Sequence, residues 1–157
     1  MGDVGQDTRE EVDILLPGKN YQWAFIEGFA PGPKARPGSV IGTEQPPLWD
    51  YPHASGDGCV IGGYVYRGTN FPALTGKYIT VDNVSGRIWT VASTNGVTLD
   101  SVQQIANMPP GSVYGGTSSM GLDANGEVYF VKIGGVGAGQ IYKLKTIPTT
   151  ESSSGGR

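Results

Sequence analysis

The sequence has 157 residues and a formal net charge of −3, with 38% hydrophobic residues, which is enough for one domain with a core of its own. No basic stripe is present, so we expect no nucleic-acid partner, and no apolar run is long enough to span a membrane. Residues 1–16 lack the apolar stretch of a secretory signal peptide. The single cysteine, Cys59, cannot form an intrachain disulfide, and we expect a half-buried thiol in a strand.

The composition favours a turn-rich all-β protein. Gly and Pro are abundant, with 26 and 11 residues, and this level approaches that of disordered chains. Aromatic residues oppose disorder, because 8 Tyr, 4 Phe and 3 Trp can form a core where strands meet.

The first third of the chain predicts two extended segments and a long loop. Residues 9–16 favour a strand because Val12, Ile14 and Leu16 alternate, although a helix beginning at Glu10 is the alternative. A turn at 17–20 precedes an aromatic extended piece over 21–26. Residues 30–58 are proline-rich and predict a long loop that packs through its aromatic residues.

The rest of the chain predicts two β-meanders. The first comprises strands over 59–66, 78–82 and 87–92, which 97–105 closes, and the second comprises 119–122, 128–133 and 140–144. Turn residues separate the strands, with Ser85-Gly86 in the first meander and Asp123-Ala124-Asn125-Gly126 in the second. A glycine-rich loop spans 134–139 and opens no helix, so it is not a dinucleotide site. We expect an ordered domain over 1–147 and a disordered Ser/Gly-rich tail over 148–157.

The two meanders resemble each other. Strands that begin at Gly86 and Gly139 lie 53 residues apart, and a period near this length with about four short strands is typical of a β-propeller. A β-sandwich is the alternative that the pattern leaves open.

Several motifs in the same order resemble the glucose/sorbosone dehydrogenase family. That family contains soluble sugar dehydrogenases dependent on pyrroloquinoline quinone (PQQ) and the hedgehog-interacting-protein-like propellers. The motifs are Asp3-Val4-Gly5-Gln6, Glu10-Glu11-Val12-Asp13, Gly18-Lys19-Asn20-Tyr21-Gln22-Trp23, Tyr51-Pro52-His53, Gly62-Gly63-Tyr64-Val65-Tyr66-Arg67-Gly68, Ser85-Gly86-Arg87-Ile88-Trp89 and Leu122-Asp123-Ala124-Asn125-Gly126-Glu127-Val128-Tyr129. The resemblance implies the C-terminal portion of a six-bladed propeller, with about two blades and the edge of a third, built from antiparallel four-stranded meanders.

The resemblance also implies site residues. In the PQQ enzymes, Ca²⁺ is held partly by main-chain oxygens of the segment that matches Gly5-Gln6, and aromatic residues near the positions of Trp49 and Tyr51 lie beside PQQ. Packing of the long loop is the alternative role of these two aromatic residues. Val84, Gly116 and Ser118 stand where the sugar dehydrogenases have a lysine and arginines, so cations suited to the PQQ carboxylates are missing here.

The expected function is that of a fragment of a PQQ- and Ca²⁺-dependent dehydrogenase of an aldose or sorbosone. The family's catalytic histidine belongs to earlier blades, so we expect no catalytic base in these residues and a hydrogen-bonding role for His53, the only histidine. A non-catalytic binding module, or a partial propeller that assembles with itself, is the alternative. Partners are then a sugar, the missing blades or further copies of the chain, and the family implies an extracellular or periplasmic protein.

Overall fold

The computed structural model describes residues 1–54, 56–109, 116–134 and 138–146, and these residues form an all-β structure. The glycine-rich loop is described only in part, and the predicted tail lies outside the described residues. The elements in chain order are β1 (Gly2–Asp3), β2 (Arg9–Val12), β3 (Lys19–Asn20), β4 (Ile26–Glu27), β5 (Ala30–Pro31), β6 (Thr43–Glu44), β7 (Trp49–Pro52), β8 (Val60–Val65), a 3₁₀ turn (Pro72–Leu74), β9 (Tyr78–Asp82), β10 (Arg87–Ala92), β11 (Ser101–Asn107), β12 (Thr117–Leu122), β13 (Val128–Lys132) and β14 (Gln140–Lys143).

A four-stranded antiparallel meander, β8-β9-β10-β11, forms the largest sheet. This confirms the first predicted meander, and β9 and β10 have the predicted bounds. Both are rich in β-branched and aromatic residues, and Gly86, with a φ of 75°, permits the turn between them. The closing strand lies later than predicted, at Ser101–Asn107, because Asn95 and Asp100 organise the preceding segment as a hydrogen-bonded loop.

The second predicted meander forms a three-stranded antiparallel sheet, β12-β13-β14, which we call the third sheet. Its hairpin turn is where the sequence predicts it. The Asp123 carboxylate accepts the main-chain N–H groups of Asn125 and Glu127, both at 2.9 Å, and Gly126 has a φ of 78°. The turn residues thus fix the register of β12 on β13.

The sheet β1-β2-β7, which we call the first sheet because it comes first in the chain, corrects the expectation of a loop throughout 30–58. Trp49–Pro52 is a strand that pairs antiparallel with Arg9–Val12. The prolines around this segment argue against a strand in the sequence. Pairing with β2 stabilises the segment as a strand in the structure. Because Glu10 lies in β2, the structure excludes the alternative helix there.

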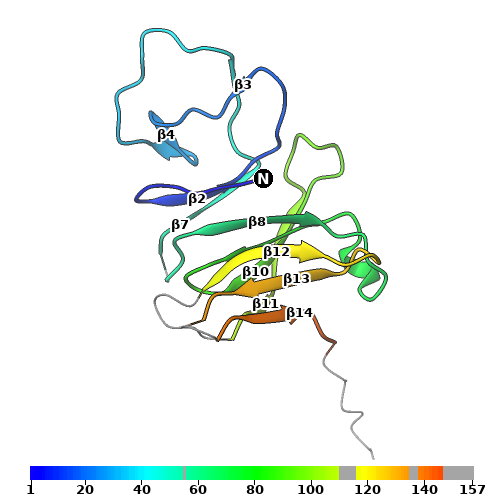
Figure 1. The fold of residues 1–157 in the computed structure, drawn as a ribbon. Coiled ribbons are helices and arrows are strands. Elements are labelled where there is room, and N and C mark those ends of the chain that lie inside the picture. The colour runs from blue at the N-terminus through cyan, green and yellow to red at the C-terminus, as the bar shows by residue number, and fades with distance from the viewer. Residues whose placement is uncertain (55, 110–115, 135–137, 147–157) are drawn as a thin grey trace, which may run out of the picture.

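Residues 13–48 extend away from the three sheets and carry the short pairs β3-β6 and β4-β5 (Figure 1). The predicted extended piece over 21–26 is wrong for most of its length, since Trp23–Phe25 form a turn and only Ile26 is in a strand. Asn20 causes the departure, because its side-chain oxygen accepts the N–H of Gln22 at 2.8 Å, and Phe25 and Ile26 both donate to the Gln22 carbonyl.

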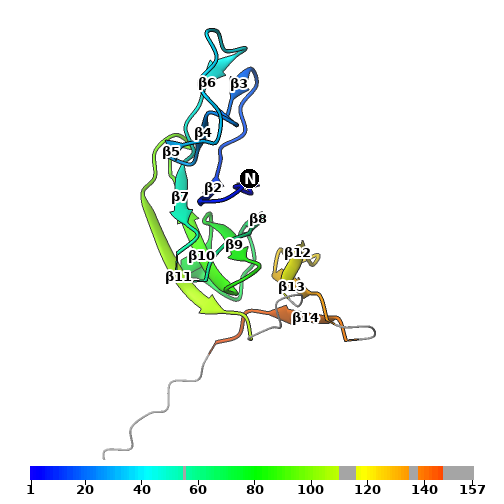
Figure 2. The same ribbon diagram turned by 90° about the vertical axis from the view of Figure 1, so that its left-hand side faces the viewer.

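The first strands of the three sheets lie next to one another. β8 contacts β1 on one side and β12 on the other, and Figure 2 shows the third sheet set apart from the meander as a separate layer. Glycine permits the approach: a Cβ on Gly2 of β1 would lie 2.9 Å from the Gly62 nitrogen of β8, and one on Gly63 of β8 would lie 3.0 Å from the Met120 sulfur of β12.

Two apolar clusters hold the sheets together. One lies between the first sheet and the meander and contains Val12, Tyr51, Val60 and Trp89. The other lies between the meander and the third sheet and comprises Tyr66, Ile79, Val81, Ile88, Met108, Met120, Val128 and Phe130. No helix in the described ranges is long or apolar enough to cross a bilayer. The all-β prediction and the four-stranded meander are therefore confirmed.

Candidate functional site

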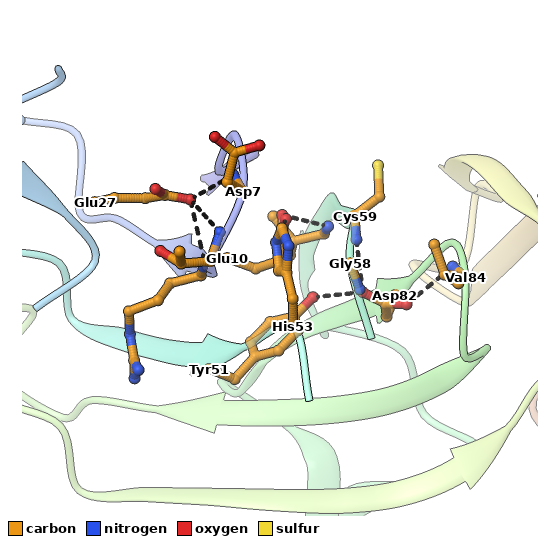
Figure 3. A network of polar contacts seen from close by, with 12 residues as sticks. Asp7, Glu10, Glu27, Tyr51, His53, Gly58, Cys59, Asp82 and Val84 are labelled. Atoms are coloured by element: carbon orange, nitrogen blue, oxygen red, sulfur yellow. Dashed lines mark hydrogen bonds and ion pairs between the residues drawn. The ribbon is translucent and has the colours of Figure 1, made fainter. Parts of the chain in front are cut away.

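Buried carboxylates gather where the first sheet meets the meander (Figure 3). We call Glu10, Glu27 and Asp82, with Tyr51 and His53, the carboxylate network. Glu10 and Asp82 are completely buried, and Glu27 is 4% exposed. Glu10 and Glu11, on the central strand β2, are also buried, at 0% and 8% exposed, although charged side chains are seldom buried without partners.

Asp82, at the end of β9, accepts five hydrogen bonds. Its Oδ2 accepts the Tyr51 hydroxyl and the N–H groups of Gly58 and Cys59, each at 2.9 Å. Its Oδ1 accepts the N–H groups of Val84 at 2.9 Å and Ser85 at 2.7 Å. Asp82 therefore stabilises the turn between β9 and β10, and the same carboxylate joins two sheets.

Glu10 links β2 to the loop after β7 and to β8. One oxygen contacts His53 Nε2 at 2.6 Å and the other accepts the Val60 N–H at 2.8 Å. Burial raises the pKa of Glu10, while the hydrogen bonds from Val60, His53 and Gly5 oppose this rise. The predicted hydrogen-bonding role of His53 is confirmed.

Glu27 holds the turn that follows β1. Its Oε1 accepts three consecutive main-chain N–H groups, from Asp7, Thr8 and Arg9, at 2.9–3.1 Å. These donors outweigh the effect of burial and lower the Glu27 pKa to about 2. The adjoining Arg9 forms a two-pronged ion pair with Asp50 of β7.

Gly5 and Gln6, the predicted calcium ligands, lie in this turn. A Cβ on Gly5 would lie 1.6 Å from the Arg9 oxygen and 2.6 Å from Glu27 Oε1, so the turn requires glycine. Gln6 is exposed and donates to Asp7. Among the described residues, no hydrogen bond ends on the main-chain oxygen of Gly5 or Gln6, and their role as calcium ligands stays a prediction.

Trp49 and Tyr51, the predicted cofactor neighbours, pack against Trp89 of β10. Ring centroids lie 5.0 Å apart for Trp49 and Tyr51, 4.9 Å for Tyr51 and Trp89, and 5.5 Å for Trp49 and Trp89. Tyr51 is 6% exposed and its hydroxyl is bonded to Asp82. Tyr51 therefore has no free face for a quinone, and its packing role, the alternative at the sequence level, accounts for its position.

The network is suited to holding loops rather than to proton transfer. Burial and the neighbouring Asp82 carboxylate raise the Tyr51 pKa, so its hydroxyl remains a donor. Cys59 is half-buried as predicted, and burial raises its pKa, which opposes thiolate formation. Each carboxylate instead accepts main-chain N–H groups from a segment distant in sequence.

A second acidic group was missed at the sequence level. Asp3, Glu11 and Asp13 each offer a carboxylate oxygen, and these atoms lie within 4.8 Å of one another. Both side-chain oxygens of Asp13 are buried and have no hydrogen-bond partner among the described residues. The alternation of Glu11 and Asp13 was the available signal, since residues two apart in an extended chain share a face.

Curated relatives match the chain over a fraction of their length. The HIPL1 protein of Arabidopsis thaliana is 30% identical over 159 aligned residues, which cover 85% of this chain and 23% of HIPL1. The HIPL2 protein of the same plant is 34% identical over 96 residues, which cover 55% of this chain and 14% of HIPL2. The chain thus spans less than a quarter of these relatives, to which it has a distant similarity. No family model matches the sequence.

Proposed function

We propose that the chain forms C-terminal blades of a six-bladed propeller of the glucose/sorbosone dehydrogenase family. In this proposal the complete propeller oxidises a CH–OH group of an aldose or sorbosone with PQQ and Ca²⁺, and it is an exported protein. The isolated chain is inactive, because the catalytic base lies on other blades. The adjacency of β1, β8 and β12 is the observation that carries the proposal.

This adjacency supports a radial arrangement. Each of the three strands is the first of its sheet, and the later strands follow outward in the orders β1-β2-β7, β8-β9-β10-β11 and β12-β13-β14. In a propeller the first strands of successive blades surround the axis. The four-stranded meander then corresponds to one full blade, and the other two sheets to incomplete ones.

A repeated contact between successive sheets also supports the proposal. Tyr51 of the first sheet donates to Asp82 of the meander at 2.9 Å. Tyr66, which follows β8 of the meander, donates at 2.7 Å to Glu127, in the turn between β12 and β13. Each acid also accepts two consecutive main-chain N–H groups, those of Gly58 and Cys59 for Asp82 and those of Thr69 and Asn70 for Glu127. A Tyr–carboxylate bond thus joins each pair of successive sheets, from different strand positions: Tyr51 lies in the last strand of its sheet, and Tyr66 follows the first strand of the meander.

The similarity to HIPL1 covers most of this chain, and the HIPL proteins belong to the proposed family. The residues here fit the metal better than the quinone. The main-chain oxygens of Gly5 and Gln6 suit Ca²⁺, a hard cation that prefers oxygen, whereas buried Tyr51 is unavailable for stacking. PQQ, when bound to the parent, would accept the hydride of the sugar, and this chain would contribute the Gly5-Gln6 turn.

A chimera tests the blade assignment. The matching region of HIPL1 is replaced by this chain, and the product is compared with HIPL1 and with HIPL1 lacking the region. We expect the chimera to be a monomer that unfolds cooperatively on heating, and to oxidise glucose or sorbosone with added PQQ and Ca²⁺. The isolated chain should show no turnover under the same conditions.

The possible outcomes separate fold from chemistry. A chimera that fails to fold where HIPL1 folds would contradict the blade assignment. If the chimera and HIPL1 both fold but neither oxidises the sugars, the dehydrogenase part of the proposal is contradicted. That outcome would favour a non-catalytic propeller.

An assembling module is the second candidate, and the exposed edge of the third sheet favours it. β14 pairs only with β13 in the described structure, and Ile141 on β14 is 70% exposed. A free edge with an apolar side chain invites pairing with another strand. A measured mass of two or more chains in solution would support this candidate, and a stable monomer would oppose it.

A further inference from the structure

We propose that Asp3, Glu11 and Asp13 form a binding site for a calcium-like divalent cation, distinct from the Gly5-Gln6 turn. The inference rests on the side chains of β1, β2 and the residue that follows β2, and it does not depend on the proposed function.

Strand pairing brings the three acids together. Asp3 of β1 is the register partner of Glu11 of β2, and Asp13 follows Glu11 by two positions, which places both on one face of the chain. One carboxylate oxygen from each residue lies within 4.8 Å of the other two. Three oxygens that are at most 4.8 Å apart share a point no more than about 2.8 Å from each, and calcium–oxygen distances are about 2.3–2.6 Å, so a small inward movement of the side chains lets one ion bind all three.

The carboxylate of Asp13 is a second, independent observation that points to a bound cation. Its side chain is 3% exposed, and neither Oδ1 nor Oδ2 has a hydrogen-bond partner. A buried carboxylate without a partner is costly. The α-ammonium group of Met1 lies nearby, but it donates to the main-chain oxygen of Asp13, at 2.7 Å, and leaves the carboxylate unpaired.

One of the two carboxylate oxygens of Glu11 has a hydrogen-bond partner. Its Oε2 accepts the Gly28 N–H at 2.8 Å, and this bond orients the carboxylate and leaves Oε1 available. Burial, followed by the charge of Asp13, raises the Glu11 pKa to about 8, and burial, followed by Asp3, raises the Asp13 pKa to about 6. A divalent cation would supply the positive charge that these buried, mutually repelling carboxylates lack.

The ligand chemistry favours Ca²⁺ over a softer metal. All three side chains offer oxygen, with no His or Cys in the cluster. Asp13 also lines a cavity of about 280 Å³ together with Met1 and Tyr78.

Thermal unfolding and calorimetric titration of the whole chain with CaCl₂, after removal of metals by a chelator, test the site. We expect Ca²⁺ in large excess over Kd to raise Tm by about 5 °C or more, and Mg²⁺ to raise it less.

Asp13→Asn is the diagnostic variant, because it keeps the shape of the side chain and removes its charge. We expect it to lose the calcium-dependent rise in Tm while it equals or exceeds the stability of the metal-free parent chain. Asp7→Asn, in the Gly5-Gln6 turn, is the matched control and should keep the rise. Absence of a calcium effect on the parent chain, or an equal effect in Asp13→Asn, would overturn the proposal.

Discussion

At the scale of single residues, Asp82 has the largest expected effect on stability. Asp82→Ala removes the acceptor of five buried or partly buried donors, so we expect it to lower the free energy of unfolding by about 3 kcal/mol or more. Tyr51→Phe, the control, keeps the aromatic packing and removes one hydrogen bond, and it should cost about 1 kcal/mol. Urea unfolding measures both losses, and an Asp82→Ala loss no larger than that of Tyr51→Phe would contradict this role.

Glu11 predicts an unusual dependence of stability on pH. Its pKa in the folded chain, about 8, exceeds the ordinary value of 4.5, so between these values the folded state retains a proton that the unfolded chain has lost. The free energy of unfolding should therefore fall as pH rises from 4.5 to 8, by on the order of 3 kcal/mol in the absence of divalent cations. Glu27, with a lowered pKa of about 2, affects stability only at lower pH.

Glu11→Gln tests this assignment, because it keeps the side-chain volume and an oxygen that can accept the Gly28 N–H. Chemical unfolding at pH 5 and pH 8 in the presence of a chelator should show a smaller difference for Glu11→Gln than for the parent chain. The exposed control Asp7→Asn should keep the full difference. Stability that rises between these pH values in the parent chain would refute the argument.

Residue chemistry also marks the limit of sequence analysis at the site. The turn roles of Asp82 and of Asp123 were predictable, because Asp before Gly-containing turns bonds to nearby N–H groups. The burial of Glu10 was not, since it arises from β7 and from Val60, which lies 50 residues away. Local patterns cannot show that a charged residue is covered by a distant segment.

At the scale of elements, Gly63 controls how closely β8 approaches its neighbours. A Cβ there would lie 1.8 Å from the Ile79 oxygen and 3.0 Å from the Met120 sulfur. We expect Gly63→Ala to cost about 2 kcal/mol or more, through displacement of β8. Gly121→Ala in β12 is the matched control, because its Cβ would meet nothing within 4 Å. Thermal unfolding compares the two, and equal stability would contradict the close packing of β8.

Strands were predictable where local propensity and pairing agree. β9 and β10 combine β-branched and aromatic residues with a glycine turn, and the sequence predicts both correctly. β7 was missed because it lies among prolines and is stabilised by long-range pairing with β2. The segment 21–26 failed for the opposite reason: its aromatic residues favour a strand, but Trp23 is 52% exposed and lies in a turn.

At the scale of the whole molecule, the sheets differ in their number of strands, and this difference predicts whether the chain associates in solution. The meander has four strands and the third sheet has three, with β14 at its edge. If the radial arrangement is correct, a further strand belongs beside β14 in a complete propeller. The isolated chain then presents unpaired main-chain groups and the exposed side chain of Ile141.

We therefore expect the isolated chain to associate through β14 in a concentration-dependent manner. Ile141→Lys should shift it toward the monomer, because a charge on an edge strand opposes pairing. Val97→Lys is the control, since Val97 is similarly exposed, at 69%, but lies in the loop before β11. Light scattering coupled to size-exclusion chromatography gives the masses. If Val97→Lys and Ile141→Lys had the same effect on the mass, association would not involve β14. A parent chain that stayed monomeric at all concentrations would show that this edge does not drive assembly.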